Sequence, residues 1–307
     1  MICPPKEIAA LYIRGLIPKR IARSLFYRST LFTTCHQDAA VLHTINFGTL
    51  AMRLDLPLRY KQNWTFLFES FDGPPDGVSL RVYSLIAAVS NFIYDVGMNA
   101  GLYLYHGVAS APMDAVVVGV EPNSGLASLV RSNLSANGIT NAKVETACCS
   151  DVDGLAELFT TNTDHMSSLE PDFLRASGRP LLGTHTVATL SLDTYARRNA
   201  VGMDLVKIDV EGHEEKALAG AWHSIERWHP TLITEITSPE TSGYLLERLQ
   251  GLGYRCFYCC GNRLLAIRDS TELLRLRRDG DMNYVFVQRD AHLRAIDTLV
   301  ASICSSS

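Results

Sequence analysis

The stretch Asn91–Gly101, NFIYDVGMNAG, decides the fold of this chain. Its first part, Asn91 to Val96, is an apolar run of the kind that forms a strand covered on both faces. Gly97 and Gly101 follow, and glycines there let the backbone turn tightly and let a ligand approach main-chain amides. The stretch therefore predicts a buried strand, a ligand-binding turn, and a helix whose amino end is electropositive.

Apolar runs of the same kind recur toward the C-terminus, separated by segments with helical periodicity. We predict further strands at Ala115–Val120, Ala142–Cys148, Leu205–Val210, Thr231–Ile236, Arg255–Tyr258 and Tyr284–Val287. We predict helices at Asn123–Asn137, with Asn123 as the N-cap and Gly138 as the stop, and at Glu214–Trp228. The alternation of strand and helix predicts an α/β fold with a doubly wound, mostly parallel sheet.

Composition excludes several classes of protein. The chain has 307 residues, of which 47% are hydrophobic and 20% charged, so disorder, collagen and coiled coil are excluded as the main state. The net charge of −4 lacks the basic footprint of a nucleic-acid binder. No uncharged apolar run reaches the roughly 18 residues that a membrane-spanning helix needs. We therefore expect neither a nucleic-acid partner nor a transmembrane segment.

The eight cysteines fit neither a disulfide framework nor a zinc site. Cys148-Cys149 and Cys259-Cys260 are adjacent pairs, and the C-x-x-C that starts at Cys256 has no second ligand pair. Residues 1–34 scatter basic residues among apolar ones and lack the clean apolar stretch of a secretory signal. Reduced thiols and the missing signal indicate a cytoplasmic protein.

The first 90 residues show no sharp strand pattern. Leu11–Phe32 mixes basic and apolar residues and predicts a helix with one basic face. Such a face is usually solvated, on a helix that caps the domain, although it could also contact a membrane surface or dock a substrate. Phe71–Gly77, FDGPPDG, is a turn by composition. We treat residues 1–90 as a helical or cap region without an assigned role.

Asp95 indicates which ligand the glycine turn would accept. It stands two residues before Gly97, where it would repel a diphosphate and attract an ammonium group. The turn also lacks the G-x-G-x-x-G spacing of a dinucleotide site. S-adenosylmethionine carries an ammonium group on its amino-acid tail and has no phosphate. It is therefore a better ligand for this turn than NAD.

Glu121 ends the second predicted strand, 26 residues after Asp95. That distance is close to the one at which such folds place an acid on ribose hydroxyls. A carboxylate accepts two strong hydrogen bonds from a cis-diol. An acid at the end of a strand could simply be exposed, but its spacing from the glycine turn favours a role in binding.

The segment Lys207–Glu214, KIDVEGHE, places titratable groups where the fourth predicted strand ends. Ligands of open α/β sheets bind beyond the carboxyl ends of the strands. Asp209, His213 and Glu211 are therefore candidate general bases, in that order. Asp209 leads because an acid within an apolar strand is costly without a partner. Glu214 is better explained as an acid in the first turn of a helix.

These pieces occur in one order along the chain, and the ordered set resembles the FkbM-type S-adenosylmethionine-dependent methyltransferases. The resemblance runs from Phe92 to Val287 and rests on YDVGMNAGLY at 94–103, VEPN at 120–123, SDVDG at 150–154, SSL at 167–169, TLSLD at 189–193, LVKIDVEGHE at 205–214 and NYVF at 283–286. It implies a methyltransferase domain at 91–290, with a cap region before it and a C-terminal tail at 291–307.

The resemblance also implies a fold, a cofactor and site residues. The fold would be the class I methyltransferase (Rossmann-like) sheet of seven strands, six parallel and one antiparallel, with helices on both faces. S-adenosylmethionine would be held at its methionine end by Asp95, Gly97, Asn99 and Gly101, at its ribose by Glu121 with Asn123 beside it, and near its adenine by Ser150 and Asp151. Known members methylate hydroxyl groups of sugars or polyketides.

The chain departs from the family pattern at several positions. Met98 stands where Ala is usual, and its longer side chain could weaken cofactor binding; Val120 replaces a common Phe. The segment Pro171–Gly183 is expected to be a longer loop than usual, with Phe173–Gly183 as a lid on the substrate side. Ser168 and His165 could orient the acceptor.

Three functions stay open at this point. The first is an O-methyltransferase for a small-molecule or glycan hydroxyl. The second is a catalytically inactive fold that binds S-adenosylmethionine and acts as a scaffold, and the third is a dinucleotide oxidoreductase. Asp209 and Glu235 end neighbouring strands and could hold a divalent cation, but hard cations need more oxygen ligands than this, so we assign no metal. The oligomeric state is not readable from the sequence.

Overall fold

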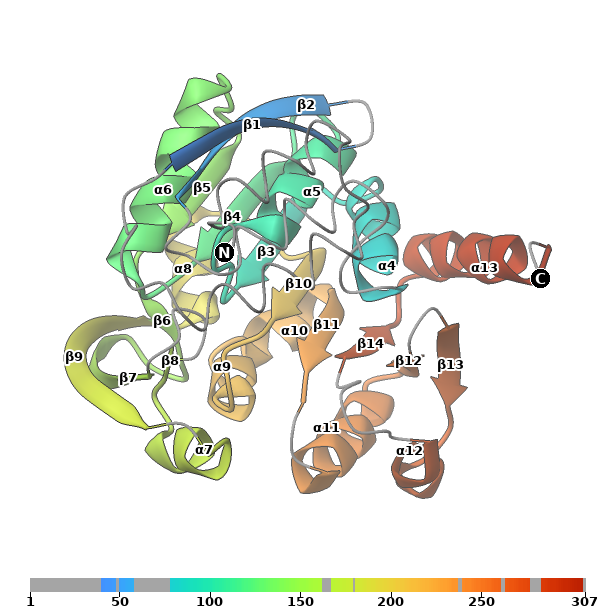
Figure 1. Cartoon of the computed structure of the whole chain (residues 1–307). Coiled ribbons are helices and arrows are strands. Elements are labelled where there is room, and N and C mark those ends of the chain that lie inside the picture. The colour runs from blue at the N-terminus through green and yellow to red at the C-terminus, as the bar shows by residue number, and fades with distance from the viewer. Residues whose placement is uncertain are drawn as a thin grey trace, which may run out of the picture. The chain divides into compact units, whose positions relative to one another are not determined.

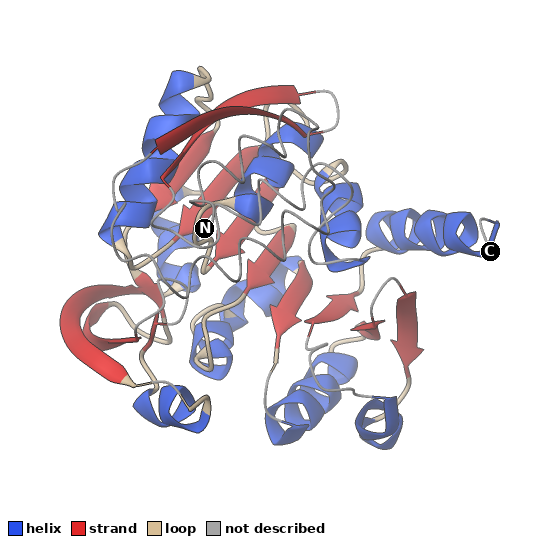
Figure 2. Cartoon of the chain, in the orientation of Figure 1, coloured by secondary structure: helices blue, strands red, loops and turns tan. Residues whose placement is uncertain are grey.

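The computed structural model describes residues 40–47, 50–57, 78–161, 167–178, 180–236, 239–260, 263–276 and 283–305 (Figures 1 and 2). The chain divides into two compact units, Met1–Pro75 and Asp76–Ser307. The predicted basic helix at Leu11–Phe32 and the turn at Phe71–Gly77 lie outside the described residues.

The described part of the first unit is an antiparallel hairpin. Strand β1 (Ala40–Phe47) pairs with β2 (Leu50–Pro57) from Ala40 opposite Pro57 to Phe47 opposite Leu50. Along β2, Met52 and Leu54 are buried while Ala51 and Arg53 are exposed, the alternation of a strand with one covered face. The sequence patterns predict no strand in this region, because the alternation covers only a few residues.

The second unit is built on an eight-stranded sheet in the described part of the chain (Figure 1). Its order is β13-β12-β14-β11-β10-β3-β4-β5. The strands are β3 (Phe92–Val96), β4 (Val116–Val120), β5 (Ala142–Glu145), β10 (Leu205–Ile208), β11 (Thr231–Glu235), β12 (Arg255–Cys260), β13 (Arg263–Ile267) and β14 (Asn283–Val287). The first five of these run parallel, and β14 lies antiparallel between β11 and β12.

The α/β fold with a mostly parallel sheet is therefore confirmed, but the expected count of seven strands is wrong. Strand β13 pairs antiparallel with β12 and adds an eighth strand at the edge. Its residues are mostly half-buried or exposed, in the pattern of an edge strand. Its sequence, RLLAI, contains a short apolar run that we did not assign to a strand.

Helices cover both faces of the sheet, as expected (Figure 2). On one face, a buried cluster joins Tyr94, Val118 and Val206 to side chains of the helices α8 (Leu192–Asn199), α9 (Glu214–Ala219), α10 (Trp222–Trp228), α11 (Pro239–Gly251) and α12 (Ser270–Leu276). The opposite face packs on helix α5, where Gly107 lies against Ile93 and Val117. The helices of that group are α4 (Val78–Ala87), α5 (Leu102–Ser110), α6 (Ser124–Ala136) and α13 (Asp290–Ser305).

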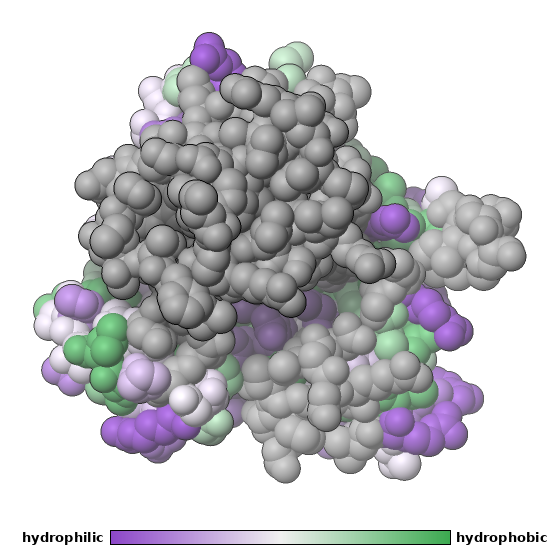
Figure 3. Space-filling model, viewed as in Figure 1, coloured by the Kyte–Doolittle hydropathy of each residue, from purple (hydrophilic) through white to green (hydrophobic). Residues whose placement is uncertain are grey.

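A second, smaller sheet lies between β5 and α8 in the chain. It has the order β6-β9-β7-β8, with strands β6 (Cys148–Cys149), β7 (Gly154–Thr161), β8 (Ser167–Ser168) and β9 (Leu181–Leu190), and it carries helix α7 (Pro171–Ala176). Exposed apolar side chains gather on it, among them Leu155 and Leu182, and Figure 3 shows hydrophobic surface over β7 and β9.

Two predictions in this region are wrong. The predicted strand Ala142–Cys148 ends at Glu145, and Cys148 belongs to the second sheet, paired with β9. The expected loop Pro171–Gly183 is largely structured, because Pro171 begins α7 and Leu181 begins β9. Proline is favoured at the first position of a helix, and β9 is rich in Thr and Val, which suit strands.

The predicted helix Glu214–Trp228 is also broken, into α9 and α10. The break is at Gly220, where an added Cβ would lie 2.0 Å from the carbonyl oxygen of Ser150. The Ser191 hydroxyl donates to the carbonyl of Gly220 at 2.9 Å. The Asp193 carboxylate accepts from the amides of His223 and Ser224 and so caps α10. Long-range contacts therefore divide this segment into two helices, although its apolar periodicity predicts one continuous helix.

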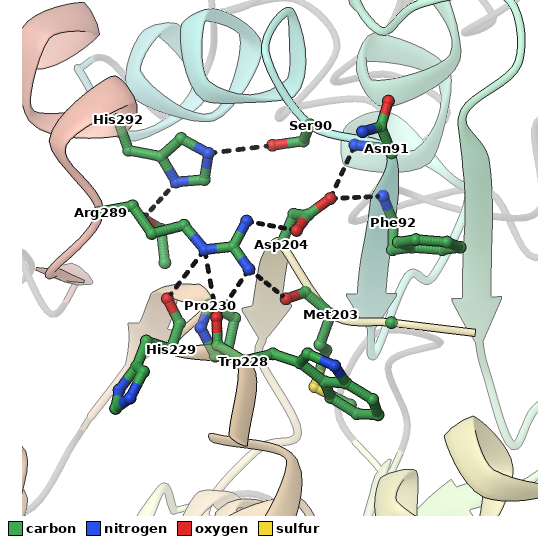
Figure 4. A network of polar contacts seen from close by, with 12 residues as sticks. Ser90, Asn91, Phe92, Met203, Asp204, Trp228, His229, Pro230, Arg289 and His292 are labelled. Atoms are coloured by element: carbon green, nitrogen blue, oxygen red, sulfur yellow. Dashed lines mark hydrogen bonds and ion pairs between the residues drawn. The ribbon is translucent and has the colours of Figure 1, made fainter. Parts of the chain in front are cut away.

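A polar network ties the amino ends of three strands together, at the end of the sheet opposite to the glycine turn (Figure 4). Asp204 precedes β10 and accepts hydrogen bonds from the amides of Asn91 and Phe92, at 2.8 and 3.0 Å. Arg289 forms an ion pair with Asp204 and donates to the carbonyl groups of Met203 and Trp228. The network holds β3, β10 and the start of β11 in register.

Candidate functional site

The turn after β3 can only be made by glycine. Gly97 has φ +74°, and an added Cβ would lie 1.7 Å from the carbonyl oxygen of Asp209. The amide of Gly97 donates to the carbonyl of Val120, and the amide of Asp209 donates to that of Val96. The glycine turn is therefore fixed between the carboxyl ends of β4 and β10.

Asp95 lies under this turn and is buried. Its Oδ2 accepts a hydrogen bond from the amide of Leu104 at 2.8 Å, in the first turn of α5. Burial raises the pKa of Asp95 to about 7, although the ammonium group of Lys207 and this hydrogen bond act in the opposite direction. The carboxyl group thus connects the end of β3 to the amino end of α5.

Glu121 meets the glycine turn directly. Its Oε2 accepts from the amide of Asn99 at 2.9 Å and its Oε1 from the amide of Asn123 at 2.8 Å. Burial raises the pKa of Glu121 to about 7, while these two hydrogen bonds lower it. Each carboxylate oxygen has a second lone pair that can accept a hydrogen bond from a hydroxyl group.

Asn123 also performs the predicted structural task. Its Oδ1 accepts from the amides of Gly125 and Leu126, so its role as N-cap of α6 is confirmed. The main-chain amide of Asn123 therefore donates to Glu121, whereas its side chain caps the helix.

Asn99 gives the strongest indication that the turn binds a ligand. It adopts the left-handed conformation with φ 53°, which Asn tolerates better than most residues. Its Oδ1 is buried and has no hydrogen-bond partner in the structure as described. Because a buried acceptor without a partner is costly, this oxygen fits a donor supplied by a ligand, such as the ammonium group of S-adenosylmethionine.

Met98 is buried and its side chain packs over Gly119 of β4. It is 3% exposed, and its Sδ would lie 2.4 Å from a Cβ added at Gly119 of β4. The long side chain thus fills the space over a glycine in the neighbouring strand. The core accommodates Met98 at the position where the family usually has Ala.

The candidate bases of the segment after β10 have different surroundings. Asp209 accepts from the Nζ of Lys207 at 3.0 Å, and its side chain is 34% exposed while that of Lys207 is 2% exposed. Glu211 adopts φ 54°, and its carbonyl oxygen accepts from the Ser168 hydroxyl at 2.6 Å. Asp209 therefore presents a carboxylate that is both held by a cation and accessible.

His213 is buried, and both its ring nitrogens have partners. Nδ1 lies 2.8 Å from Oε1 of Glu170, and Nε2 lies 2.9 Å from the hydroxyl oxygen of Ser150. Burial lowers the pKa of His213, although the Glu170 carboxylate opposes this. Ser150 also donates to the exposed Asp151 at 3.0 Å. The structure thus joins Ser150 and Asp151 to His213, and within the described residues no hydrogen bond or ion pair links them to the glycine turn.

Glu214 is an acid in the first turn of α9, as expected. Its Oε1 accepts from the amides of Val210 and Gly212, both at 3.1 Å, and so shapes the loop that carries Glu211. Burial raises the pKa of Glu214 to about 7. His165 lies outside the described residues.

Two residues beside Asp209 received no catalytic role in the predictions from the sequence. Lys207 lies within an apolar run and is assigned only to a strand, and Glu235 is considered only as one half of a possible cation site. The buried lysine is the available signal, because a buried charge requires a partner. Within the described residues, no group of three or more His, Cys, Asp or Glu side chains is placed to hold a metal ion. Each described helix is too short or too polar to cross a membrane.

A mostly parallel sheet with an antiparallel strand inserted between β11 and β12, a glycine turn after β3 and an acid at the end of β4 define a class I methyltransferase fold. The Methyltransferase FkbM domain family matches residues 95–256, more than half of the chain. The chain therefore belongs to the FkbM methyltransferase domain family, and the resemblance inferred from the ordered motifs is confirmed.

Solved structures with similar folds come from several kinds of methyltransferase. The FkbM methyltransferase of Methylobacillus flagellatus KT is 15% identical with a TM-score of 0.38, and the match covers 64% of this chain and 43% of that one. An O-methyltransferase from Bacillus cereus in complex with SAH is 12% identical (TM-score 0.38; 70% and 84% covered). An rRNA methylase from Streptococcus thermophilus is 13% identical (TM-score 0.40; 68% and 94% covered). No curated protein matches the sequence.

Proposed function

We propose that this chain is an S-adenosylmethionine-dependent O-methyltransferase whose acceptor is a hydroxyl group of a sugar, a glycan or a polyketide-like small molecule. The observation that carries the proposal is the contact between Glu121 and the amide of Asn99. It places an acid suited to ribose hydroxyls against the turn whose buried Asn99 oxygen has no partner among the described residues. A single ligand with a diol and an ammonium group would satisfy both residues, the diol at Glu121 and the ammonium group at Asn99.

The charges around the turn favour a cationic ligand. Asp95, Glu121 and Asp209 are near enough for the charge of Asp209 to raise the pKa of each of the other two. A phosphate group would be repelled by this set of acids, whereas a sulfonium and an ammonium would be attracted. The geometry therefore supports S-adenosylmethionine over a dinucleotide.

Asp209 is the base that the geometry supports best. When bound, S-adenosylmethionine supplies an electrophilic methyl group on sulfur. The protein must align an acceptor hydroxyl with that group and remove the hydroxyl proton, and a general base contributes about 10²- to 10⁴-fold. Asp209 is accessible and paired with Lys207. His213 is a weaker candidate because both of its ring nitrogens already have partners.

Calorimetric titration with S-adenosylmethionine, S-adenosylhomocysteine and NAD tests the cofactor. We expect micromolar binding of the first two, lost in Glu121→Ala and kept in Glu215→Ala, whose side chain is exposed on α9. Wild-type protein that binds NAD, or binds none of the three, would refute the proposal.

Transfer of a labelled methyl group tests the reaction. Hydroxylated sugars, glycans and polyketides serve as acceptors and RNA as a contrast, and mass spectrometry locates the methyl group. Labelled O-methyl products from the hydroxylated acceptors are expected. Transfer to RNA, or cofactor binding without transfer to any acceptor, would contradict the proposed activity, and the second outcome would indicate a binding protein built on the same fold.

A further inference from the structure

Two carboxyl groups meet at the carboxyl ends of the neighbouring parallel strands β10 and β11. Ile208 is opposite Thr234 in the register, so the next residues, Asp209 and Glu235, follow side by side. The two acids are close enough that the charge of Asp209 is the largest cause of the raised pKa of Glu235. Two carboxyl groups can share a hydrogen bond only when one of them carries a proton.

Lys207 decides which of the two is ionised. It is opposite Ile233 in the register, and alternation along the strands places Lys207, Asp209 and Glu235 on the same face of the sheet. Its Nζ donates to Oδ2 of Asp209 at 3.0 Å. The lysine side chain is 2% exposed, so its ammonium group needs an anionic partner inside the protein, and Asp209 is the acid with which it forms an ion pair.

The charges around Glu235 favour its neutral form. The charge of Asp209 and burial raise the pKa of Glu235 to about 9, the charge of Glu211 adds to this, and Lys207 acts in the opposite direction. Because Lys207 is paired with Asp209, the proton of the two acids is assigned to Glu235. Glu235 is then a hydrogen-bond donor at neutral pH.

We propose, on the basis of the proposed methyltransferase function, that Glu235 is a positioning residue that stays protonated and orients the Asp209 carboxylate by donating a hydrogen bond to it. Lys207 holds one oxygen of Asp209 and Glu235 completes the support, so the carboxylate is aimed at the acceptor hydroxyl. In the step that it serves, the O–H bond of the acceptor breaks and its proton passes to Asp209. An O–C bond forms, and the S–C bond breaks with its electron pair remaining on sulfur.

The test is a ¹³C NMR titration of the glutamate side-chain carboxyls of the full chain, without added ligand. We expect one resonance to titrate near pH 9, to disappear in Glu235→Gln and to remain in Glu215→Gln. In Asp209→Asn we expect the acid dissociation constant of Glu235 to rise more than tenfold, because the largest cause of its raised pKa is removed. A Glu235 resonance that titrates in the ordinary carboxyl range, near about 4, would overturn the proposal.

Two further measurements distinguish a positioning role of Glu235 from a cation site and from simple packing. In the methyl-transfer assay, Glu235→Gln should retain most of the activity, since an amide can still donate to Asp209, whereas Glu235→Ala should lose it. Equal losses in both variants would overturn the positioning role, as would a shift of the Glu235 resonance on addition of Mg²⁺, which would indicate a cation site. Failure of the wild type to bind S-adenosylmethionine would refute the proposed function while leaving the NMR result on the pair intact.

Discussion

Substitution of Gly97 by alanine tests whether the contact between the glycine turn and β10 controls cofactor binding. An alanine Cβ would lie 1.7 Å from the carbonyl oxygen of Asp209, a backbone atom that no rotamer change can remove. Real Cβ contacts are essentially never shorter than 3.0 Å, so one side must shift by roughly 1.3 Å. Both sides are held by main-chain hydrogen bonds, Gly97 to Val120 and Asp209 to Val96.

The magnitude follows from these constraints. A residue with a Cβ at positive φ costs about 1 to 2 kcal/mol, and breaking one of the two main-chain hydrogen bonds costs about 1 kcal/mol more. We therefore expect Gly97→Ala to lower the free energy of unfolding by about 2 to 3 kcal/mol. A displacement of roughly 1 Å in a positioned group can cost about 100-fold in rate, so we expect affinity for S-adenosylmethionine to fall about 10- to 100-fold.

Gly138→Ala is the matched control, because Gly138 also has positive φ, +67°, but an added Cβ would meet nothing within 4 Å. Denaturant unfolding should show only the backbone cost of about 1 to 2 kcal/mol for this variant, and calorimetry should show unchanged binding. If Gly97→Ala binds the cofactor as tightly as Gly138→Ala does, the contact between the glycine turn and β10 does not control cofactor binding.

Four further outcomes are expected. Met98→Ala should lose about 2 to 5 kcal/mol of stability from a core cavity yet keep cofactor affinity by calorimetry, whereas tighter binding would show that Met98 obstructs the site. Asp204→Asn should lower the free energy of unfolding by about 2 to 3 kcal/mol and Tm by about 4 to 12 °C, and an unchanged melting curve would show that the Arg289 network contributes nothing. Because burial raises the pKa of both Asp95 and Glu121 to about 7, folded protein retains protons that the unfolded chain releases above about pH 4. These two groups should therefore make stability fall as pH rises from about 4 to 7. A cationic cofactor should bind more tightly as pH rises through 7, with proton release visible in buffers of different ionisation enthalpy; an affinity that falls with pH would contradict this.

The residues of the proposed cofactor site could be predicted from the sequence because they are local features of strands and turns. The apolar run before Gly97 predicts a buried strand, and the glycines after it predict a turn. The interval from Asp95 to Glu121 is one strand–helix–strand repeat, so it predicts that both acids emerge at the same edge of the sheet. The spacing led us to expect an acid near the glycine turn, and the structure adds a hydrogen bond from the amide of Asn99 to Glu121 that we did not predict.

The tertiary structure alone decided how the residues around Asp209 are paired. Glu235 meets Asp209 through strand register, and His213 meets Glu170 and Ser150 across 43 and 63 residues of chain. The break at Gly220 and the edge strand β13 likewise depend on elements distant in the chain. Periodicity and propensity report on neighbours within a few residues, whereas the ionisation and orientation of a buried group depend on whatever the fold brings beside it. The sequence thus determined the family, the central strands and the turn, and the packing determined which acids are buried, which are paired and which cap a helix.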